Sequence, residues 1–221
     1  MKSGSSIKIT LTSDGSITDW GFKIDRVDYR YFYNTELTSP GTWDCTNFVS
    51  QCIWAAYGGY VPSNDTTTRT NISNKVRMVN TGTLNTSWYG GTGGGSPYWE
   101  QVPVLWNFAT NTTKVNGPKA TGYNNSSSYA NITPSTVNAG NVLQFFNYRK
   151  SPQEYTHSVY VTYKPSSGTI TWSNLLVSYH STDSKNVPVI DLINSFTGPN
   201  GSATQPCKMR GMSFLSASFS S

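Results

Sequence analysis

The chain has 221 residues and a mass of 24.3 kDa, which suits one sizeable domain rather than two. Only 12% of the residues are charged, and 30 Ser, 28 Thr and 20 Asn supply the polarity, but aromatic residues reach 14%, which excludes intrinsic disorder for most of the chain. The net charge of +5 is spread without Lys/Arg runs, and no stretch approaches the roughly 18 apolar residues of a membrane span, so we expect neither nucleic-acid binding nor a membrane-spanning helix.

The N-terminal residues 1–20 are predicted to be a tail, a linker or an edge strand, followed by a single domain over 21–221. No apolar signal segment follows Met1, yet sparse charge with abundant Ser, Thr and Asn is typical of secreted bacterial surface proteins. We therefore expect a secreted or cell-surface protein whose signal peptide is absent from this sequence. Ile24, Val27 and Tyr31 have helical spacing, although the aromatic run 29–33 fits a strand equally well.

The clearest helix is predicted over residues 45–57. Asp44 is a natural N-cap, and Gly58 and Gly59 supply the stop. One apolar stripe follows at helical spacing: Phe48, Val49, Cys52, Ile53 and Ala56.

Further along the chain, the pattern changes from helical to β. Residues 98–110 carry a predicted helix, with Val102, Leu105 and Trp106 on one face. Strands are predicted over 141–146, 156–163 and 175–180. An N-terminal helix followed by an antiparallel sheet indicates the α+β class.

Cys45 stands in the first turn of the predicted helix, where unpaired N–H groups and partial positive charge favour a thiolate. This position predicts a thiol pKa below the usual value of about 8.5, although a small buried core cysteine would look the same. Cys52 lies two turns later, about 10.5 Å away, which is too far for a disulfide, and is predicted to be core. The sequence gives no role for Cys207, and three cysteines leave at least one free thiol.

Two histidines are the remaining candidates for catalysis. His157 opens a predicted strand, from which an imidazole can reach a thiol on a facing helix and act as a general base. His180 ends the next apolar run and could orient that base, with Ser178 and Asp183 as the alternatives. No Cys/His cluster has zinc spacing, so we expect neither a metal site nor a cofactor.

The nine residues 44–52, DCTNFVSQC, resemble the putative amidase domain of Gram-positive bacteria, a relative of the NlpC/P60 cysteine peptidases. Further matching segments follow in the order of that family. Tyr98-Trp99 to Phe108 is similar to its Trp-bearing helix, and residues 139–145 resemble its Gly-Asp-hydrophobic-Gln strand, with Asn141 in place of Asp. Residues 156–162 and 178–183 are similar to its histidine strand and to the His-Thr-x-Asp that follows.

The resemblance implies a papain-like α+β core, with the helix that bears the cysteine packed on an antiparallel sheet. It implies that Cys45 is the nucleophile, His157 the base and His180 the third catalytic residue. Asp44 matches the acidic residue that precedes the cysteine in those relatives, and Tyr33, or else Tyr31, is the candidate for oxyanion support. Compared with the family, the chain departs at residues 25–29 and over 60–140, segments that bear on the choice of substrate rather than on the nucleophile.

The leading functional hypothesis is a cysteine amidase or peptidase that cleaves cell-wall peptide through an acyl-thioester. An alternative is an inactive module on the same fold that binds glycan or peptide. Its stacking residues would be Trp88, Tyr89, Tyr98 and Trp99, which are also candidate substrate contacts of the enzyme. A further alternative is a secreted peptidase or acyltransferase acting on host or competitor proteins. We expect a monomer in each case.

Overall fold

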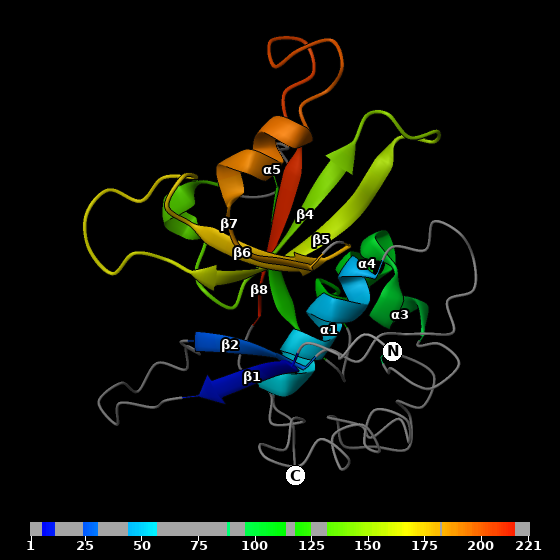
Figure 1. Cartoon of the computed structure of the whole chain (residues 1–221). Coiled ribbons are helices and arrows are strands. Elements are labelled where there is room, and N and C mark those ends of the chain that lie inside the picture. Colours follow the sequence, from blue (N-terminus) through cyan, green and yellow to red (C-terminus); the bar gives the residue numbers. More distant parts are fainter. Residues whose placement is uncertain are drawn as a thin grey trace, which may run out of the picture.

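Six antiparallel strands form the main sheet of the computed structural model, which describes residues 6–11, 24–30, 44–56, 88, 96–113, 118–124, 132–181 and 183–214. The spatial order of the strands is β3-β8-β4-β5-β6-β7 (Figure 1). Their bounds are β3 Ala120–Asn124, β4 Val142–Asn147, β5 Glu154–Tyr163, β6 Leu176–His180, β7 Asp183–Pro188 and β8 Met209–Phe214. The C-terminal strand β8 lies inside the sheet, between β3 and β4.

Each central strand alternates its side chains between two apolar cores. On β4, Val142 faces one core and Leu143 the other; on β5, Tyr160 and Val161 divide in the same way. In the β4–β5 register Leu143 lies opposite Val159, so side chains of neighbouring strands that face the same core lie next to each other. The sheet is therefore buried on both faces at its centre.

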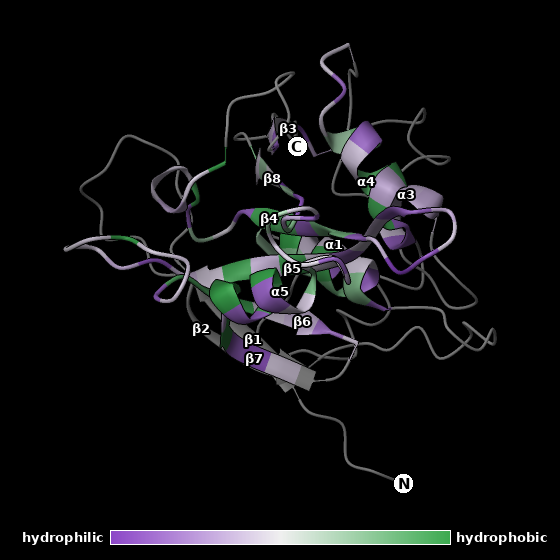
Figure 2. Ribbon diagram, turned by 90° about the horizontal axis from the view of Figure 1, so that it is seen from above, coloured by the Kyte–Doolittle hydropathy of each residue, from purple (hydrophilic) through white to green (hydrophobic). Residues whose placement is uncertain are grey.

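Helices cover both faces of the sheet. Helix α1 (Cys45–Ala56) packs with α3 (Pro97–Glu100) and α4 (Val102–Ala109) over one face. On the opposite face lie α5 (Val189–Ser195) and the 3-10 turn η1 (Pro134–Thr136). Figure 2 shows green, hydrophobic residues on α1, β5 and α5. This arrangement confirms the predicted α+β class, with the Cys45 helix packed on an antiparallel sheet.

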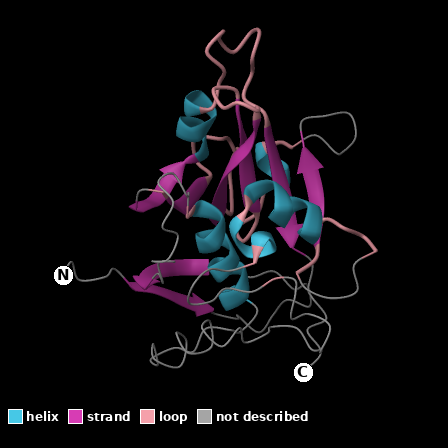
Figure 3. Ribbon diagram, turned by 90° about the vertical axis from the view of Figure 1, so that its right-hand side faces the viewer, coloured by secondary structure: helices cyan, strands magenta, loops and turns pink. Residues whose placement is uncertain are grey.

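A separate antiparallel ribbon is formed by β1 (Ser6–Leu11) and β2 (Ile24–Arg30), as Figure 3 shows beside the main sheet. Of the two alternatives that the sequence left for the region after Ile24, the strand is therefore found. β1 also gives residues 6–11 the strand structure that was one of the alternatives for the N-terminal segment.

The predicted helix over 98–110 is found as two shorter helices, α3 and α4, which are separated at Gln101. Gln101 has an extended backbone, with φ −104° and ψ 128°. Pro103 lies in the first turn of α4, where its missing N–H is tolerated; inside a continuous helix the same proline would break the hydrogen-bond ladder. The predicted apolar face, Val102, Leu105 and Trp106, is buried.

The predicted helix 45–57 and the three predicted strands are found, with ends that differ by a few residues. The sequence did not predict β3, β7, β8 or α5. β8 pairs with β3 and β4, which lie more than 60 residues earlier, and a local pattern cannot reveal such pairing. Among the described helices, none is both long and apolar enough to span a membrane.

Gly211 in β8 offers a test of this packing. A Cβ at this position would lie 2.7 Å from Cδ1 of Ile132 and 3.3 Å from Cδ2 of Leu143, both of which are core side chains. We expect Gly211→Ala to lower the free energy of unfolding by about 1–3 kcal/mol, measured by chemical denaturation. Thr121→Ala on the exposed side of β3 is the control, and an equal loss in both variants would contradict the tight packing.

Candidate active site

Cys45 is the first residue of α1 and is fully buried, at 0% exposure. Its Sγ accepts a hydrogen bond from the backbone N–H of Ser158 in β5, over 3.4 Å, and lies 3.9 Å from the carbonyl oxygen of Thr156. The residue between these two backbone groups is His157. The first turn of α1 therefore meets β5 at the position of the predicted base.

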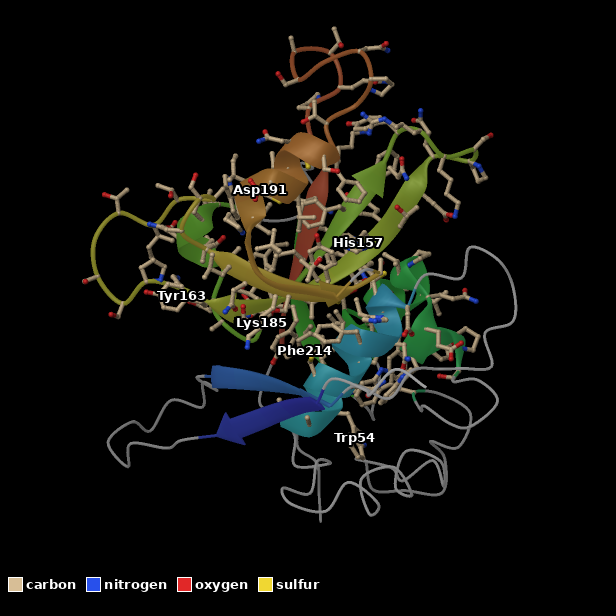
Figure 4. The ribbon with its side chains drawn as sticks, viewed as in Figure 1. Trp54, His157, Tyr163, Lys185, Asp191 and Phe214 are labelled. Atoms are coloured by element: carbon tan, nitrogen blue, oxygen red, sulfur yellow. The ribbon has the colours of Figure 1, made fainter. Side chains whose placement is uncertain are left out.

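The imidazole of His157 lies in an aromatic environment on β5 (Figure 4). It stacks on Phe196, with ring centroids 5.7 Å apart and planes 13° from parallel, and meets Tyr179 edge-on at 4.8 Å. Burial lowers the pKa of His157 from 6.5 to about 4, because the surrounding apolar rings disfavour the imidazolium. His157 is therefore neutral at pH 7 and able to accept a proton.

His180 and Asp44 meet at the other side of the helix start. Nδ1 of His180 lies 3.2 Å from Oδ2 of Asp44, and both side chains are largely buried. Asp44 also accepts a hydrogen bond on Oδ1 from the side chain of Asn47, and its carbonyl accepts the first helical hydrogen bond, from Phe48. These contacts fix Asp44 at the start of α1, as its N-cap position predicted, and place the His180 ring beside the residue that precedes Cys45.

The structure places Asp44 and His180 beside the start of α1, but of His157 only the flanking backbone contacts Cys45, because its imidazole packs on the opposite face of the sheet. His157 shares the sheet face of Val159 and packs toward Phe196, whereas His180 contacts Asp44 beside α1. Among the described residues, no hydrogen bond joins Cys45 Sγ to either imidazole. Catalytic hydrogen bonds in ligand-free structures are often long and shorten only when substrate binds.

The predicted low pKa of the Cys45 thiol is not found. Burial is the largest influence and raises the pKa of the thiol instead of lowering it, and the charge of Asp44 raises it further. The hydrogen bonds from Ser158 and Thr46 lower it, but not enough to reverse the effect. The sequence argument counted the helix N-terminus and could not count the loss of water around the sulfur.

The aromatic residues predicted to contact substrate are packed inside the protein wherever the structure describes them. Trp88 and Trp99 are 7% and 2% exposed, with ring centroids 4.6 Å apart. The Trp99 indole donates to Oδ1 of Asn47 over 2.6 Å, and Tyr98 packs on Phe108. The two tryptophans contact α1, and the half-buried Tyr98 packs α3 on α4, so these rings are engaged in packing rather than forming an exposed stacking surface. Tyr31, Tyr33 and Tyr89 lie outside the described residues.

The alternatives to His180 and the other cysteines have different surroundings. Ser178 is fully buried, and its Oγ accepts from the backbone N–H of Asn186 in β7. Asp183 pairs with His180 in the β6–β7 ladder. Cys52 lies in the core, as predicted, and burial raises its pKa strongly, while the pKa of the half-buried Cys207 rises to about 12.

Sequence reasoning missed the polar side chains beneath Cys45. Thr46, Gln144 and Ser158 are each 0% exposed and are hydrogen-bonded to one another in a chain. A signal was available, since Gln144 is the one polar residue in the run of residues 142–146 of a predicted strand.

The putative amidase domain model matches residues 18–199, which is most of the chain. The chain belongs to this family. Membership assigns a generic amidase-type hydrolase activity, directed at an amide bond. No curated protein and no solved structure matched the chain. The described residues contain no group of three or more His, Cys, Asp or Glu side chains that could hold a metal ion.

The buried His157 predicts a pH dependence of stability. Its pKa is about 4 in the folded protein and 6.5 when unfolded, so the unfolded chain binds the proton more tightly. The contribution of the neutral imidazole to the free energy of unfolding is fully present above about pH 6.5. It is lost as the pH drops toward 4, and the loss is on the order of 3 kcal/mol. In His157→Phe, which keeps a ring beside Phe196, we expect a flatter profile in urea unfolding from pH 7 to 4. Parallel profiles for the two proteins would contradict the burial of a neutral imidazole.

Proposed function

We propose that this amidase domain is a cysteine-dependent hydrolase in which Cys45 is the nucleophile, His157 the base and His180, held by Asp44, the orienting group. The observation that carries the proposal is the contact of Cys45 Sγ with the backbone on both sides of His157, at the helix start where His180 meets Asp44. The proposal requires the imidazole of His157 to turn from its packing on Phe196 toward the thiol when substrate binds. A papain-like relationship with the NlpC/P60 peptidases belongs to the same proposal.

The reaction divides amide hydrolysis into two steps. As Sγ attacks the carbonyl carbon, the thiol proton moves to His157, and the new S–C bond gives a tetrahedral oxyanion. His157 then donates that proton to the leaving nitrogen, the C–N bond breaks, and an acyl-thioester remains. Water, deprotonated by the same imidazole, attacks the thioester and releases the acid and the thiol.

The electrostatics favour proton transfer during attack rather than a preformed ion pair. Burial raises the pKa of Cys45 and lowers that of His157 to about 4, so both groups are neutral at rest. The thiol therefore needs the base at the moment of attack, as a serine hydroxyl does. The backbone N–H groups at the start of α1 would stabilise the oxyanion, and Tyr33, which lies outside the described residues, stays the side-chain candidate for this role.

We assign the substrate to bacterial cell-wall peptide and the location to the cell surface or the secreted fraction. The support is compositional: sparse charge, abundant Ser, Thr and Asn, and a net charge of +5 suited to an anionic wall. A monomer is sufficient, because every proposed catalytic residue comes from one chain. A peptidase or acyltransferase acting on other proteins would use the same chemistry on a different acyl donor.

A binding module without activity is the second candidate. Complete burial of Cys45 and its raised pKa favour this interpretation, since they describe an inert thiol. The burial of Trp88 and Trp99 counts against it, because the expected stacking rings are engaged in the core. Substitution of the cysteines separates the two candidates.

We expect Cys45→Ser to abolish amide hydrolysis and to leave the fold nearly intact. The smaller hydroxyl can still accept from the N–H of Ser158, but it is a far weaker nucleophile. The assay is release of new amines from purified peptidoglycan, with mass spectrometry of the fragments. Cys52→Ser is the matched control on the same helix; it buries a hydroxyl and should cost about 1–3 kcal/mol of stability while retaining activity. Loss of activity in Cys52→Ser alone, without loss of stability, would show that the nucleophile is misassigned.

The residual hydrolytic activity of two alanine variants distinguishes the roles of the two histidines. His157→Ala removes the base and should be nearly as damaging as loss of Cys45, whereas His180→Ala removes orientation and should leave more activity. Asp44→Asn should match His180→Ala, because Asp44 acts through its 3.2 Å contact with His180. Complete loss in both histidine variants, with folding intact, would argue that the base and the orienter are exchanged. Full activity in His180→Ala would move the third role to Ser178 or Asp183.

A further inference from the structure

A chain of buried hydrogen bonds leads from β8 to the thiol of Cys45. Its members come from three strands and from α1, and the outermost is Arg210, at 9% exposure. Arg210 donates from Nε to Oε1 of Gln144 over 2.8 Å. Its guanidinium lies between the rings of Trp106 and Tyr155, with the guanidinium carbon 4.4 Å and 3.9 Å from the two ring centroids. These rings hold the cation in one orientation at the start of the chain.

The side-chain amide of Gln144 connects Arg210 on β8 with Ser158 on β5 through hydrogen bonds. Its oxygen accepts from Arg210, so its nitrogen supplies the donors, over 2.8 Å to the carbonyl of Val102 and over 3.1 Å to Oγ of Ser158. All hydrogen-bonding sides of this fully buried amide are therefore engaged, and this fixes its orientation. Ser158 Oγ becomes an acceptor at the next link.

The hydroxyl groups then direct their protons toward the sulfur. Ser158 Oγ accepts from Gln144 and lies 3.0 Å from Oγ1 of Thr46, where either hydroxyl can donate. If Thr46 donates its one proton to the sulfur, Ser158 must be the donor to Thr46. The Thr46 hydroxyl in turn lies 3.9 Å from Cys45 Sγ, while the backbone N–H of Ser158 donates to the same sulfur over 3.4 Å. The contacts from Arg210 through Gln144, Ser158 and Thr46 thus reach the thiol.

We propose that Gln144 is a positioning residue for Cys45, acting through Ser158 and Thr46 to hold the sulfur in place and to stabilise the negative charge that forms on it. The proposal rests on the proposed role of Cys45 as the nucleophile. A chain of donors that begins at a cation favours the thiolate over the thiol. Gln144 touches no reacting atom itself, and its effect reaches the sulfur through the two hydroxyl groups.

Other ionisable groups around the thiol act alongside this chain. Asp44, at the start of α1, opposes the thiolate by its charge, and burial opposes it more strongly. His157 comes from β5, with its imidazole against Phe196, and His180 comes from β6, with its imidazole beside Asp44. Arg210 supplies the positive charge on the β8 side. In an otherwise apolar core, the donors from Thr46 and Ser158 lower the pKa of Cys45 and offset part of the effect of burial.

The test is the pH profile of Cys45 alkylation by iodoacetamide, with the modified peptide identified by mass spectrometry. In the wild-type protein we expect the rate to rise mainly above pH 9, because the thiol pKa is above 9.0. In Gln144→Met, which is similar in length but cannot donate, the midpoint should rise by about one pH unit. In the hydrolysis assay kcat should fall roughly tenfold with KM unchanged, because the charge stabilised is that of the transition state.

Matched variants at the end of the chain separate positioning from structural support. Thr46→Val removes the last hydroxyl and should shift the alkylation midpoint in the same direction, whereas Thr46→Ser keeps it and should restore the wild-type midpoint. Thr162→Val, on the same strand as Ser158, is the control: it removes hydrogen bonds to Leu176 and Asn186 and should change stability without moving the midpoint. If Gln144→Met fails to fold, the Thr46 pair decides the question.

An unchanged alkylation profile in Thr46→Val would overturn the proposal, because the series of hydrogen bonds would then stabilise the fold without affecting the thiol. The result is independent of the proposed function, since alkylation requires no amide turnover. If Cys45→Ser still hydrolysed amide while Thr46→Val shifted the midpoint, the proposed function would fail and the positioning role would remain.

Discussion

The contact between the first turn of α1 and the middle of β5 is the constraint on which the site depends. Cys45 Sγ receives the N–H of Ser158, and the Thr46 and Ser158 hydroxyl groups meet 3.0 Å apart directly beneath it. Both partners are fully buried, so neither can be satisfied by water if the helix shifts. Burial of the apolar side chains of α1 stabilises the packing of this helix on the sheet, and the polar contacts determine its position along β5.

The alternation of side chains along the strands explains how the two histidines are used. Positions two apart on β5 share a face, so His157 goes with Val159 and Val161 toward α5, while Ser158 goes with Tyr160 toward α1. His180 comes from the neighbouring strand β6 and contacts Asp44. The backbone of His157 therefore contacts the thiol while its imidazole packs among aromatic rings on the α5 face, and the imidazole of His180 lies beside the carboxylate of Asp44.

Burial sets the resting chemistry of the site. Removal of water raises the pKa of Cys45 and lowers that of His157, which opposes the thiolate–imidazolium pair that a helix N-terminus alone would favour. A protein that keeps both groups neutral avoids the cost of two buried charges until a substrate is present. The buried donors around the sulfur, directed from Arg210 through Gln144, then act where charge appears during the reaction.

The sequence by itself determined the local elements and the candidate residues. The cap at Asp44 and the stripe through Cys52 are encoded within one helix, so α1 was predicted almost to its ends, and the β4, β5 and β6 runs were equally local. The block DCTNFVSQC led to the family, which the match over 18–199 then showed. Only the tertiary structure decided the placement of β8 between β3 and β4, the facing directions of His157 and His180, and the burial of Trp88 and Trp99. It also decided the sign of the pKa change at Cys45. The physical reason is the same in each case: strand pairing between distant segments and the loss of water around a side chain depend on what the rest of the chain packs against it, and no local pattern contains that information.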